Sequence, residues 1–157
     1  IPCPYYFLFK IKNTLKKEKF FNFLDLGCGS GRVINYFNKN ISNKYFVGIE
    51  YFTTQYNYCK KIFKNHSNVK IIQEDFTKSD FFIHKADCYF FNDPFTNSTD
   101  FIKFVENIIK FSGKKKILFI FVNYNKKVID ELKYIQRIDS FYISETKGYS
   151  ICYLNNN

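Results

Sequence analysis

Three glycines at alternate positions give the chain its clearest candidate for binding a small molecule. They lie in the segment 25–31, which reads D-L-G-C-G-S-G and directly follows an apolar run. Glycine lets a backbone turn tightly, and it lets a ligand approach main-chain N–H groups without meeting a Cβ atom. The order of strand, glycine loop and helix also directs the positive end of a helix toward the ligand. The expected contacts are Asp25, Gly27, Cys28 (through its backbone), Gly29 and Gly31.

Polar residues end the apolar runs that come after this loop. Because ligands of open α/β sheets bind at the carboxyl ends of parallel strands, we expect these residues to lie near the loop. Glu50 ends the run 45–50, about 20 residues past the loop, where a carboxylate is suited to accepting hydrogen bonds from ribose hydroxyls. Tyr51 follows and is predicted either to cover a flat ring or to pack in the core. The runs 69–73 and 87–92 end at Asp75-Phe76 and at Asn92-Asp93-Pro94-Phe95.

The elements that must position these residues are those of an alternating α/β chain. Short runs rich in Phe, Ile and Val alternate with amphipathic stretches, which favours a parallel sheet covered by helices. Two later runs flank the segment 146–148 and predict a hairpin. The predicted strands are 21–26, 45–50, 69–73, 87–92 and 116–122, the helices 31–38, 53–64, 98–111 and 126–133, and the hairpin strands 138–144 and 149–154.

The opening stretch, 4–20, predicts a basic helix that lies across this sheet. Its outward lysines are expected to be Lys10, Lys12, Lys16, Lys17 and Lys19. A length of 157 residues fits one domain. We expect that domain to consist of an N-terminal helical segment (1–20), an α/β core (21–133) and a C-terminal hairpin (134–157).

Amino-acid composition limits which binding partners and which cellular compartment are expected. A net charge of +10 is compatible with nucleic acid, but only 2 of the 24 basic residues are arginine, so a solvated lysine surface is favoured. The five cysteines form no C-x-x-C pair, which argues against a disulfide framework or a metal site and favours reduced thiols in the cytoplasm. No apolar run reaches the length of about 18 residues that a membrane span needs.

The glycine spacing separates two cofactor families. A dinucleotide-binding loop reads G-x-G-x-x-G, which disfavours an NAD-dependent oxidoreductase, whereas the D-x-G-x-G-x-G of this chain resembles the first motif of class I S-adenosylmethionine (SAM) methyltransferases. The resemblance implies a Rossmann-like α/β fold, with parallel strands, a C-terminal antiparallel hairpin and helices on both faces. It also implies SAM as the cofactor. In that family Asp75, with Glu74 as the alternative, would accept a hydrogen bond from the adenine amino group, and Phe76 would line the ring.

The segment after the fourth strand resembles two groups within that family. Methyltransferases that act on amino nitrogens carry N/D-P-P-Y/F here; Asn92, Pro94 and Phe95 match this pattern, and Asp93 replaces its first proline. A group of small, little-characterised class I enzymes instead has Asn-Pro-Phe, and we favour this group, with Asp93 as an insertion. Further matches to the second group are Ile1-Pro2-Cys3-Pro4-Tyr5, 27–33, 47–50 and Val122-Asn123.

These resemblances predict a SAM-dependent methyltransferase (EC 2.1.1.-) whose acceptor the sequence does not name. Asn92, Asp93, Pro94 and Phe95 are the candidate catalytic residues, and Asn92 is also expected beside the cofactor. Methyl transfer mainly requires that two reactants be oriented and shielded from water, so a catalytic triad is not needed. An amino-nitrogen methyltransferase that acts on adenine, RNA or protein is one alternative. A non-catalytic Rossmann-like module that binds RNA is the other.

Overall fold

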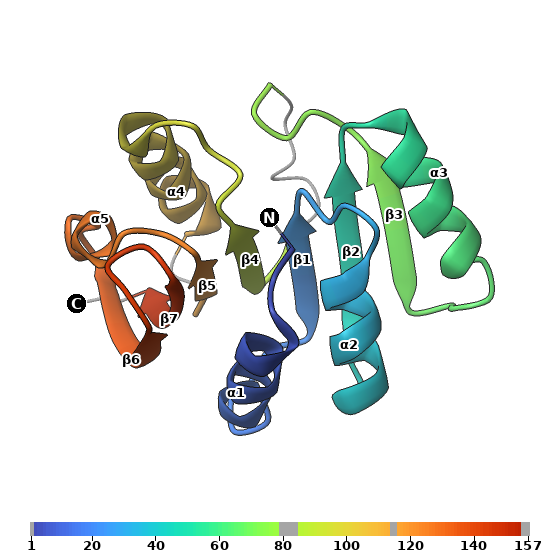
Figure 1. Cartoon of the computed structure of the whole chain (residues 1–157), viewed down its shortest axis with the longest axis horizontal. Coiled ribbons are helices and arrows are strands. Elements are labelled where there is room, and N and C mark those ends of the chain that lie inside the picture. The colour runs from blue at the N-terminus through green and yellow to red at the C-terminus, as the bar shows by residue number, and fades with distance from the viewer. Residues whose placement is uncertain (1, 79–84, 114–115, 155–157) are drawn as a thin grey trace.

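A seven-stranded sheet forms the centre of the molecule (Figure 1). The computed structural model describes residues 2–78, 85–113 and 116–154; Ile1 and residues 155–157 of the predicted C-terminal segment lie outside this part. The strands follow one another in the sheet in the order β3-β2-β1-β4-β5-β7-β6. They are β1 (Asn22–Leu26), β2 (Tyr45–Glu50), β3 (Val69–Gln73), β4 (Cys88–Asn92), β5 (Leu118–Val122), β6 (Ile135–Tyr142) and β7 (Gly148–Leu154).

The first five strands are parallel, and the direction in which the chain adds strands reverses between β1 and β4. Leu26, the last residue of β1, pairs with Ile49 of β2 on one side and with Phe91 of β4 on the other. The glycine loop therefore leaves the sheet at the point where the strand order switches. Such a switch point opens a crevice at the carboxyl ends of the strands, which is where ligands of this architecture bind.

The C-terminal hairpin is confirmed, and its two strands join the sheet out of sequence order. β7 pairs antiparallel with β5 and so lies between β5 and the edge strand β6. The hairpin begins at Ile135 and not at 138 as predicted. Exposed residues such as Gln136 and Ser140 alternate with partly buried ones along β6, because one face of this edge strand meets solvent. The apolar runs that marked the inner strands are absent there.

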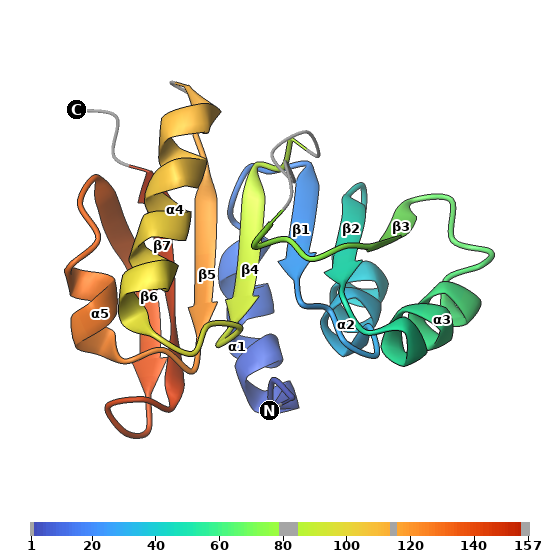
Figure 2. The same ribbon diagram turned by 90° about the horizontal axis from the view of Figure 1, so that it is seen from above.

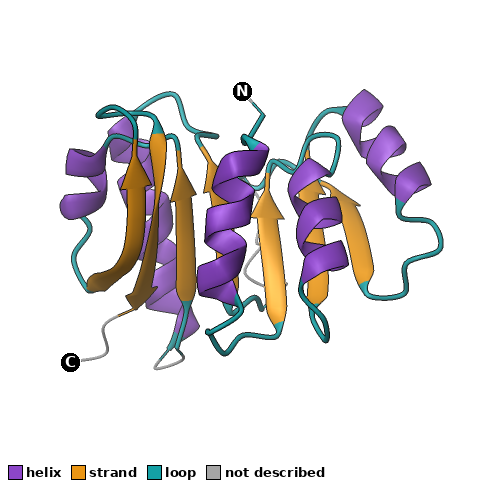
Figure 3. Ribbon diagram, turned by 60° about the horizontal axis from the view of Figure 1, so that its bottom comes forward, coloured by secondary structure: helices purple, strands orange, loops and turns teal. Residues whose placement is uncertain are grey.

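Helices cover both faces of the sheet, as expected. The helices α1, α2 and α3 supply buried side chains to one apolar cluster, and α4 and α5 supply them to the other. Figure 2 shows α4 in front of the sheet, and Figure 3 shows the opposite face with α1 and α2 in front. Their bounds are α1 (Tyr5–Leu15), α2 (Arg32–Asn40), α3 (Thr53–Ile62), α4 (Ser98–Ser112) and α5 (Lys126–Asp130).

The first helix is shorter than the predicted 4–20. It ends at Leu15, so Lys16 and Lys17 follow it in a turn and Lys19 comes after that turn; all three are exposed, while Lys10 and Lys12 lie on the helix and are half-buried. Phe7, Leu8, Ile11 and Leu15 are buried against the sheet and α2. Among the described helices, none is both long enough and apolar enough to cross a bilayer.

Phenylalanine fills the core of a chain that contains no Met and no Trp. The rings meet mostly edge to face or tilted; Phe23, for example, lies 5.4 Å from Phe37 and 5.5 Å from Phe46 between ring centroids. Such arrangements add to the gain from burying apolar area. The fully buried phenylalanines are Phe7, Phe23, Phe37, Phe46, Phe90, Phe91, Phe101, Phe119 and Phe121.

Candidate cofactor and acceptor sites

The three loop glycines have positive φ angles but face different surroundings. φ is 77° at Gly27, 55° at Gly29 and 77° at Gly31. A Cβ atom on Gly31 would lie 2.6 Å from the Cys59 sulfur and 2.7 Å from Phe63, so this glycine lets the loop pack against α3. A Cβ atom on Gly29 would meet no described atom within 4 Å. Of the three glycines, Gly29 is therefore the one with open space around its Cβ position, through which a ligand can reach its backbone.

Glu50 supports the loop from the end of β2. Glu50 is only 6% exposed, and its carboxylate accepts hydrogen bonds from the backbone N–H groups of Gly29 (2.7 Å) and Phe52 (2.8 Å). The N–H groups of Gly27 and Cys28 donate to the Ile49 carbonyl at 2.9 and 3.0 Å. The same strand end thus fixes the loop and presents a carboxylate to the crevice. Each carboxylate oxygen has a further lone pair with which it can accept a ligand hydroxyl.

Asp25 is a buried carboxyl group at the base of the loop. Asp25 is 2% exposed, and its Oδ2 atom has no hydrogen-bond partner among the described residues. Burial, followed by the nearby negative charge of Glu50, raises the pKa of Asp25 to about 8. An unpartnered buried carboxyl is costly unless something pairs with it. This side chain also lines a cavity, so a cationic ligand group can reach it.

Two adjoining cavities cover the carboxyl ends of β1, β2 and β4. One, of about 410 Å³, is lined by Asp25, Arg32 and the N-terminal residues Pro2 and Cys3, among others. The other, of about 420 Å³, is lined by Glu50, Tyr51, Asp75, Phe76 and Pro94, among others. Because the linings share four residues, the cavities form one continuous groove, which we call the cofactor groove. The shared residues are Gly27, Gly29, Gln55 and Asn92.

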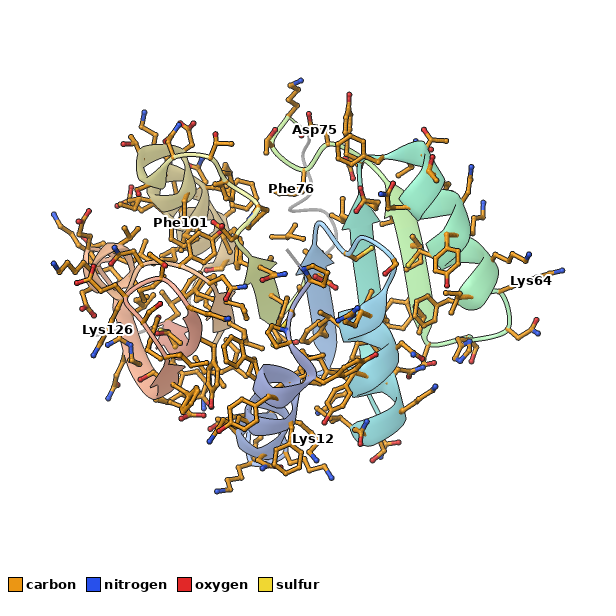
Figure 4. All side chains as sticks on the ribbon, viewed as in Figure 1. Lys12, Lys64, Asp75, Phe76, Phe101 and Lys126 are labelled. Carbon is orange, nitrogen blue, oxygen red and sulfur yellow. The ribbon has the colours of Figure 1, made fainter. Side chains whose placement is uncertain are left out.

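The β3 side of the groove carries three of the predicted contacts. Tyr51 is 60% exposed and lines the groove, so its ring is not in the core. A Cβ atom on Gly27 would lie 3.9 Å from Pro94 and 4.0 Å from Phe76, which shows how closely the loop, the β3 end and the β4 end converge. Figure 4 shows Asp75 and Phe76 on the loop after β3, above the ends of β1 and β2.

Asp75 reaches the groove with its carboxylate already engaged. Oδ1 accepts from the Thr77 backbone N–H (3.1 Å) and hydroxyl (2.6 Å), and Oδ2 lies 3.3 Å from the Lys78 ammonium. The Thr77 hydroxyl is the main reason why the pKa of Asp75 is lowered. The carboxylate is thus held charged at the groove wall. Its contact with an adenine amino group stays a prediction.

The turn after β4 forms the boundary between the groove and a separate cavity of about 210 Å³, the turn cavity. The Asn123 side-chain amide donates to the Asn92 Oδ1 atom at 2.9 Å, and Asn92 lines the groove. Asp93 has a left-handed φ of 47° and lines the turn cavity. The four predicted catalytic residues are therefore divided: Asn92 and Pro94 line the groove, and Asp93 and Phe95 line the turn cavity.

Tyr124 is a site residue that sequence analysis missed. It is 6% exposed, lines the turn cavity, and its hydroxyl has no hydrogen-bond partner among the described residues. Burial, followed by the charge of Asp93, raises its pKa well above the usual value. The strand-end rule that selected Glu50 and Asn92 also selects this residue, since it comes two positions after β5. Arg32 and Gln55, in the first turns of their helices, were missed because the rule was applied to strands only.

The fold is Rossmann-like, and the groove lies at the switch point of its sheet. Residues 23–112 match the family model described as a methyltransferase domain, which is more than half of the 157 residues, and the chain belongs to this family. Among curated proteins, none matches the sequence significantly.

Solved structures of methyltransferases have the same fold. A SAM-dependent methyltransferase from Aquifex aeolicus has a TM-score of 0.69 and 15% identity, over 94% of this chain and 89% of that one. An RNA methyltransferase from Salinibacter ruber, solved with S-adenosyl-L-homocysteine, has a TM-score of 0.68 and 15% identity, over 100% and 95%. A human methyltransferase 10 domain containing protein has a TM-score of 0.68 and 15% identity, over 98% and 84%. The family match and these neighbours support SAM as the cofactor.

Proposed function

We propose that the protein transfers a methyl group from SAM to an acceptor bound beside the turn 92–95. The observation that supports this most directly is the cofactor groove, which brings the open backbone of Gly29, the Glu50 carboxylate and the Asn92 turn to one crevice. In this assignment Glu50 accepts the ribose hydroxyls, and Tyr51 and Phe76 enclose the adenine ring with Asp75 at its edge. Asp25 then lies at the other end of the groove.

The unpartnered carboxyl of Asp25 fits the ammonium group of the methionine part of SAM. It is buried, it lines the half of the groove away from Glu50, and it lacks a described hydrogen-bond partner at Oδ2. A cation that binds there stabilises the charged carboxylate, which burial otherwise disfavours. The Gly29 backbone and the side chains of Ser30, Arg32, Gln55 and Asn92 are further polar groups that line the same cavity.

SAM supplies an activated methyl group: the acceptor's lone pair bonds to the methyl carbon, and the electron pair of the breaking bond goes to sulfur. The work left to the protein is to hold the acceptor in line and to exclude water. Asn92 is placed to help hold the acceptor in line and to exclude water, because it lines the groove and its side chain accepts a hydrogen bond from Asn123.

Binding and transfer can be tested separately. Isothermal titration with S-adenosylhomocysteine (SAH) should give saturable binding to one site, and radiolabelled SAM should label a component of RNA, DNA, protein or metabolite pools. Absence of SAH binding at millimolar concentration would contradict the proposal. Binding without transfer to any pool would instead favour a non-catalytic module.

An amino nitrogen is the acceptor that the turn cavity supports best. Its described lining contains the Asp93 carboxylate, the Tyr124 hydroxyl and several amide and hydroxyl groups, but no Lys or Arg. Partial burial raises the pKa of Asp93, so its carboxylate takes up a proton more readily than an ordinary Asp. An ammonium group bound there can pass a proton to Asp93, and the neutral amine is then the nucleophile.

Asp93→Asn should lower the rate of methyl transfer by at least about tenfold, because the proton acceptor is lost. Since the carboxylate must be charged to accept a proton, the wild-type rate should rise with pH through the raised pKa of Asp93. The variant should lack this rise. Initial rates measured as a function of pH, with the pool that radiolabelled SAM labels as the acceptor, give the rate of each protein and its pH dependence.

SAH affinity is the control for Asp93→Asn and should stay within about twofold of wild type, because Asp93 lines the turn cavity and not the groove. A variant as fast as wild type across the pH range would exclude Asp93 as the proton acceptor. Tyr124→Phe tests the buried hydroxyl in the same assay.

A further inference from the structure

We infer that the outward surface of α1 binds single-stranded nucleic acid. This surface, the α1 face, consists of three aromatic residues and the lysines beside and after them. The inference does not rest on the proposed methyl transfer, because it concerns a different part of the surface and a binding event that needs no cofactor. Its members are Tyr5, Tyr6, Phe9, Lys10, Lys12, Lys16 and Lys17.

Three aromatic rings on this short helix point away from the core. Tyr5 is 57% exposed, Tyr6 53% and Phe9 52%. Phe7, Leu8, Ile11 and Leu15 of the same helix are buried in the core. The Tyr5 ring contacts Tyr36 of α2 (5.9 Å between ring centroids) and the Tyr6 ring contacts Phe141 of β6 (5.5 Å), yet each tyrosine keeps more than half of its surface exposed. Proteins that bind single strands use exposed aromatic rings as platforms on which successive bases stack.

Cations lie directly over these rings. The Lys10 ammonium is 5.2 Å from the Tyr6 ring centroid, and the Lys12 ammonium is 4.4 Å from that of Phe9. The Arg32 guanidinium is 5.2 Å from the Tyr5 ring. The sequence of α1 contains no acidic residue, and Lys16 and Lys17 continue the positive charge past its end. The α1 face therefore offers stacking surfaces and phosphate-binding charges together.

The position of the α1 face connects it to the groove. Arg32, which covers Tyr5, also lines the groove together with Pro2 and Cys3 from the segment just before α1. Figure 1 shows α1 beside α2, the helix that follows the glycine loop, and Figure 4 labels Lys12 on the outer side of α1. A strand bound along the helix can thus extend from the far lysines to the mouth of the groove.

A nucleic acid fits the α1 face better than a lipid surface does. Membrane-surface helices bury a broad face of aliphatic and aromatic side chains in the acyl region. Here Leu8, Ile11 and Leu15 are used by the core, and the outward residues are aromatic, amide or cationic, with no exposed aliphatic side chain. A surface on which aromatic rings lie between lysines is complementary to a nucleic-acid strand, in which bases lie between phosphates.

The test measures fluorescence anisotropy of a labelled single-stranded RNA of about 12 nucleotides, without SAM, over a range of salt concentrations. The variant Lys10→Gln/Lys12→Gln/Lys16→Gln should weaken binding at least about tenfold and lower the salt dependence of the affinity. The matched control is Lys110→Gln/Lys126→Gln/Lys133→Gln, which removes the same charge from exposed lysines on the other parts of the molecule. It should change affinity by less than about threefold.

A second variant, Tyr5→Ser/Phe9→Ser, removes stacking without removing charge, and it should also weaken binding about tenfold. Equal losses in the two lysine variants would overturn the inference, because binding would then follow net charge alone. Tighter binding to anionic phospholipid vesicles than to RNA, lost in the α1 variants, would overturn it in favour of a membrane surface. Circular dichroism spectra confirm that each variant is folded. Since SAM is omitted, failure of methyl transfer leaves this result unaffected.

Discussion

Gly29→Val should reduce SAH affinity at least about 100-fold while the chain still folds. The backbone N–H of Gly29 already donates to Glu50, and a Cβ atom there would project into space that the surrounding residues leave open. A branched side chain at a φ of 55° is strained and fills the space in which the cofactor must approach the loop. Both effects act on the bound state more than on the packing of the core. Isothermal titration of the purified variant with SAH measures the change.

Gly113→Val controls for backbone strain in that experiment. Gly113 also has a positive φ, 66°, and no described atom within 4 Å of its Cβ position, but it lies between α4 and the start of β5, whereas the groove is at the carboxyl ends of the strands. This control should melt at a lower temperature than wild type yet bind SAH with unchanged affinity. If Gly29→Val retains wild-type affinity, the loop does not contact the cofactor and the assignment of the groove is wrong.

The fold could be predicted from the sequence because the patterns that indicate it are short and local. The D-x-G-x-G-x-G segment and the polar residues that end the strands are short patterns, and parallel strands bring their carboxyl ends to one edge. For that reason Gly29, Glu50 and Asn92 could be expected to meet. The bounds of β6 and of α1 were predicted less well, since an edge strand and a lysine-rich helix end give weak apolar patterns.

Burial and hydrogen-bond geometry could not be inferred in the same way. Whether the Asp75 carboxylate is open or engaged by Thr77, and whether Tyr124 has a partner, depends on distances between residues that are close only in the folded chain. The exposure of Tyr5 and Phe9 is another case, because a helical pattern of Phe and Tyr favours a buried position. These features decide which residues are free to contact ligands.

Asp25→Asn should change how stability depends on pH. The folded chain holds the Asp25 proton up to about pH 8, whereas in the unfolded chain the group ionises near the reference value of 3.8. Between these values unfolding releases a proton, so the free energy of unfolding of wild type should fall as pH rises, by at most about 1.4 kcal/mol per pH unit. Asn carries no such proton, and the variant should lack this contribution. Urea unfolding at pH 5, 7 and 9 tests the difference; parallel curves would contradict the buried, neutral state.

The same carboxyl should couple cofactor binding to proton release. If the SAH ammonium binds beside Asp25, its positive charge offsets the burial that raises the pKa, and the proton leaves at pH 7. Titrations in buffers with different ionisation enthalpies should then give different apparent binding enthalpies for wild type and equal ones for Asp25→Asn. Equal enthalpies for wild type would place the ammonium elsewhere in the groove. Because Asp25 belongs to β1 and not to the glycine loop, this result would place the cofactor at the switch point of the sheet itself.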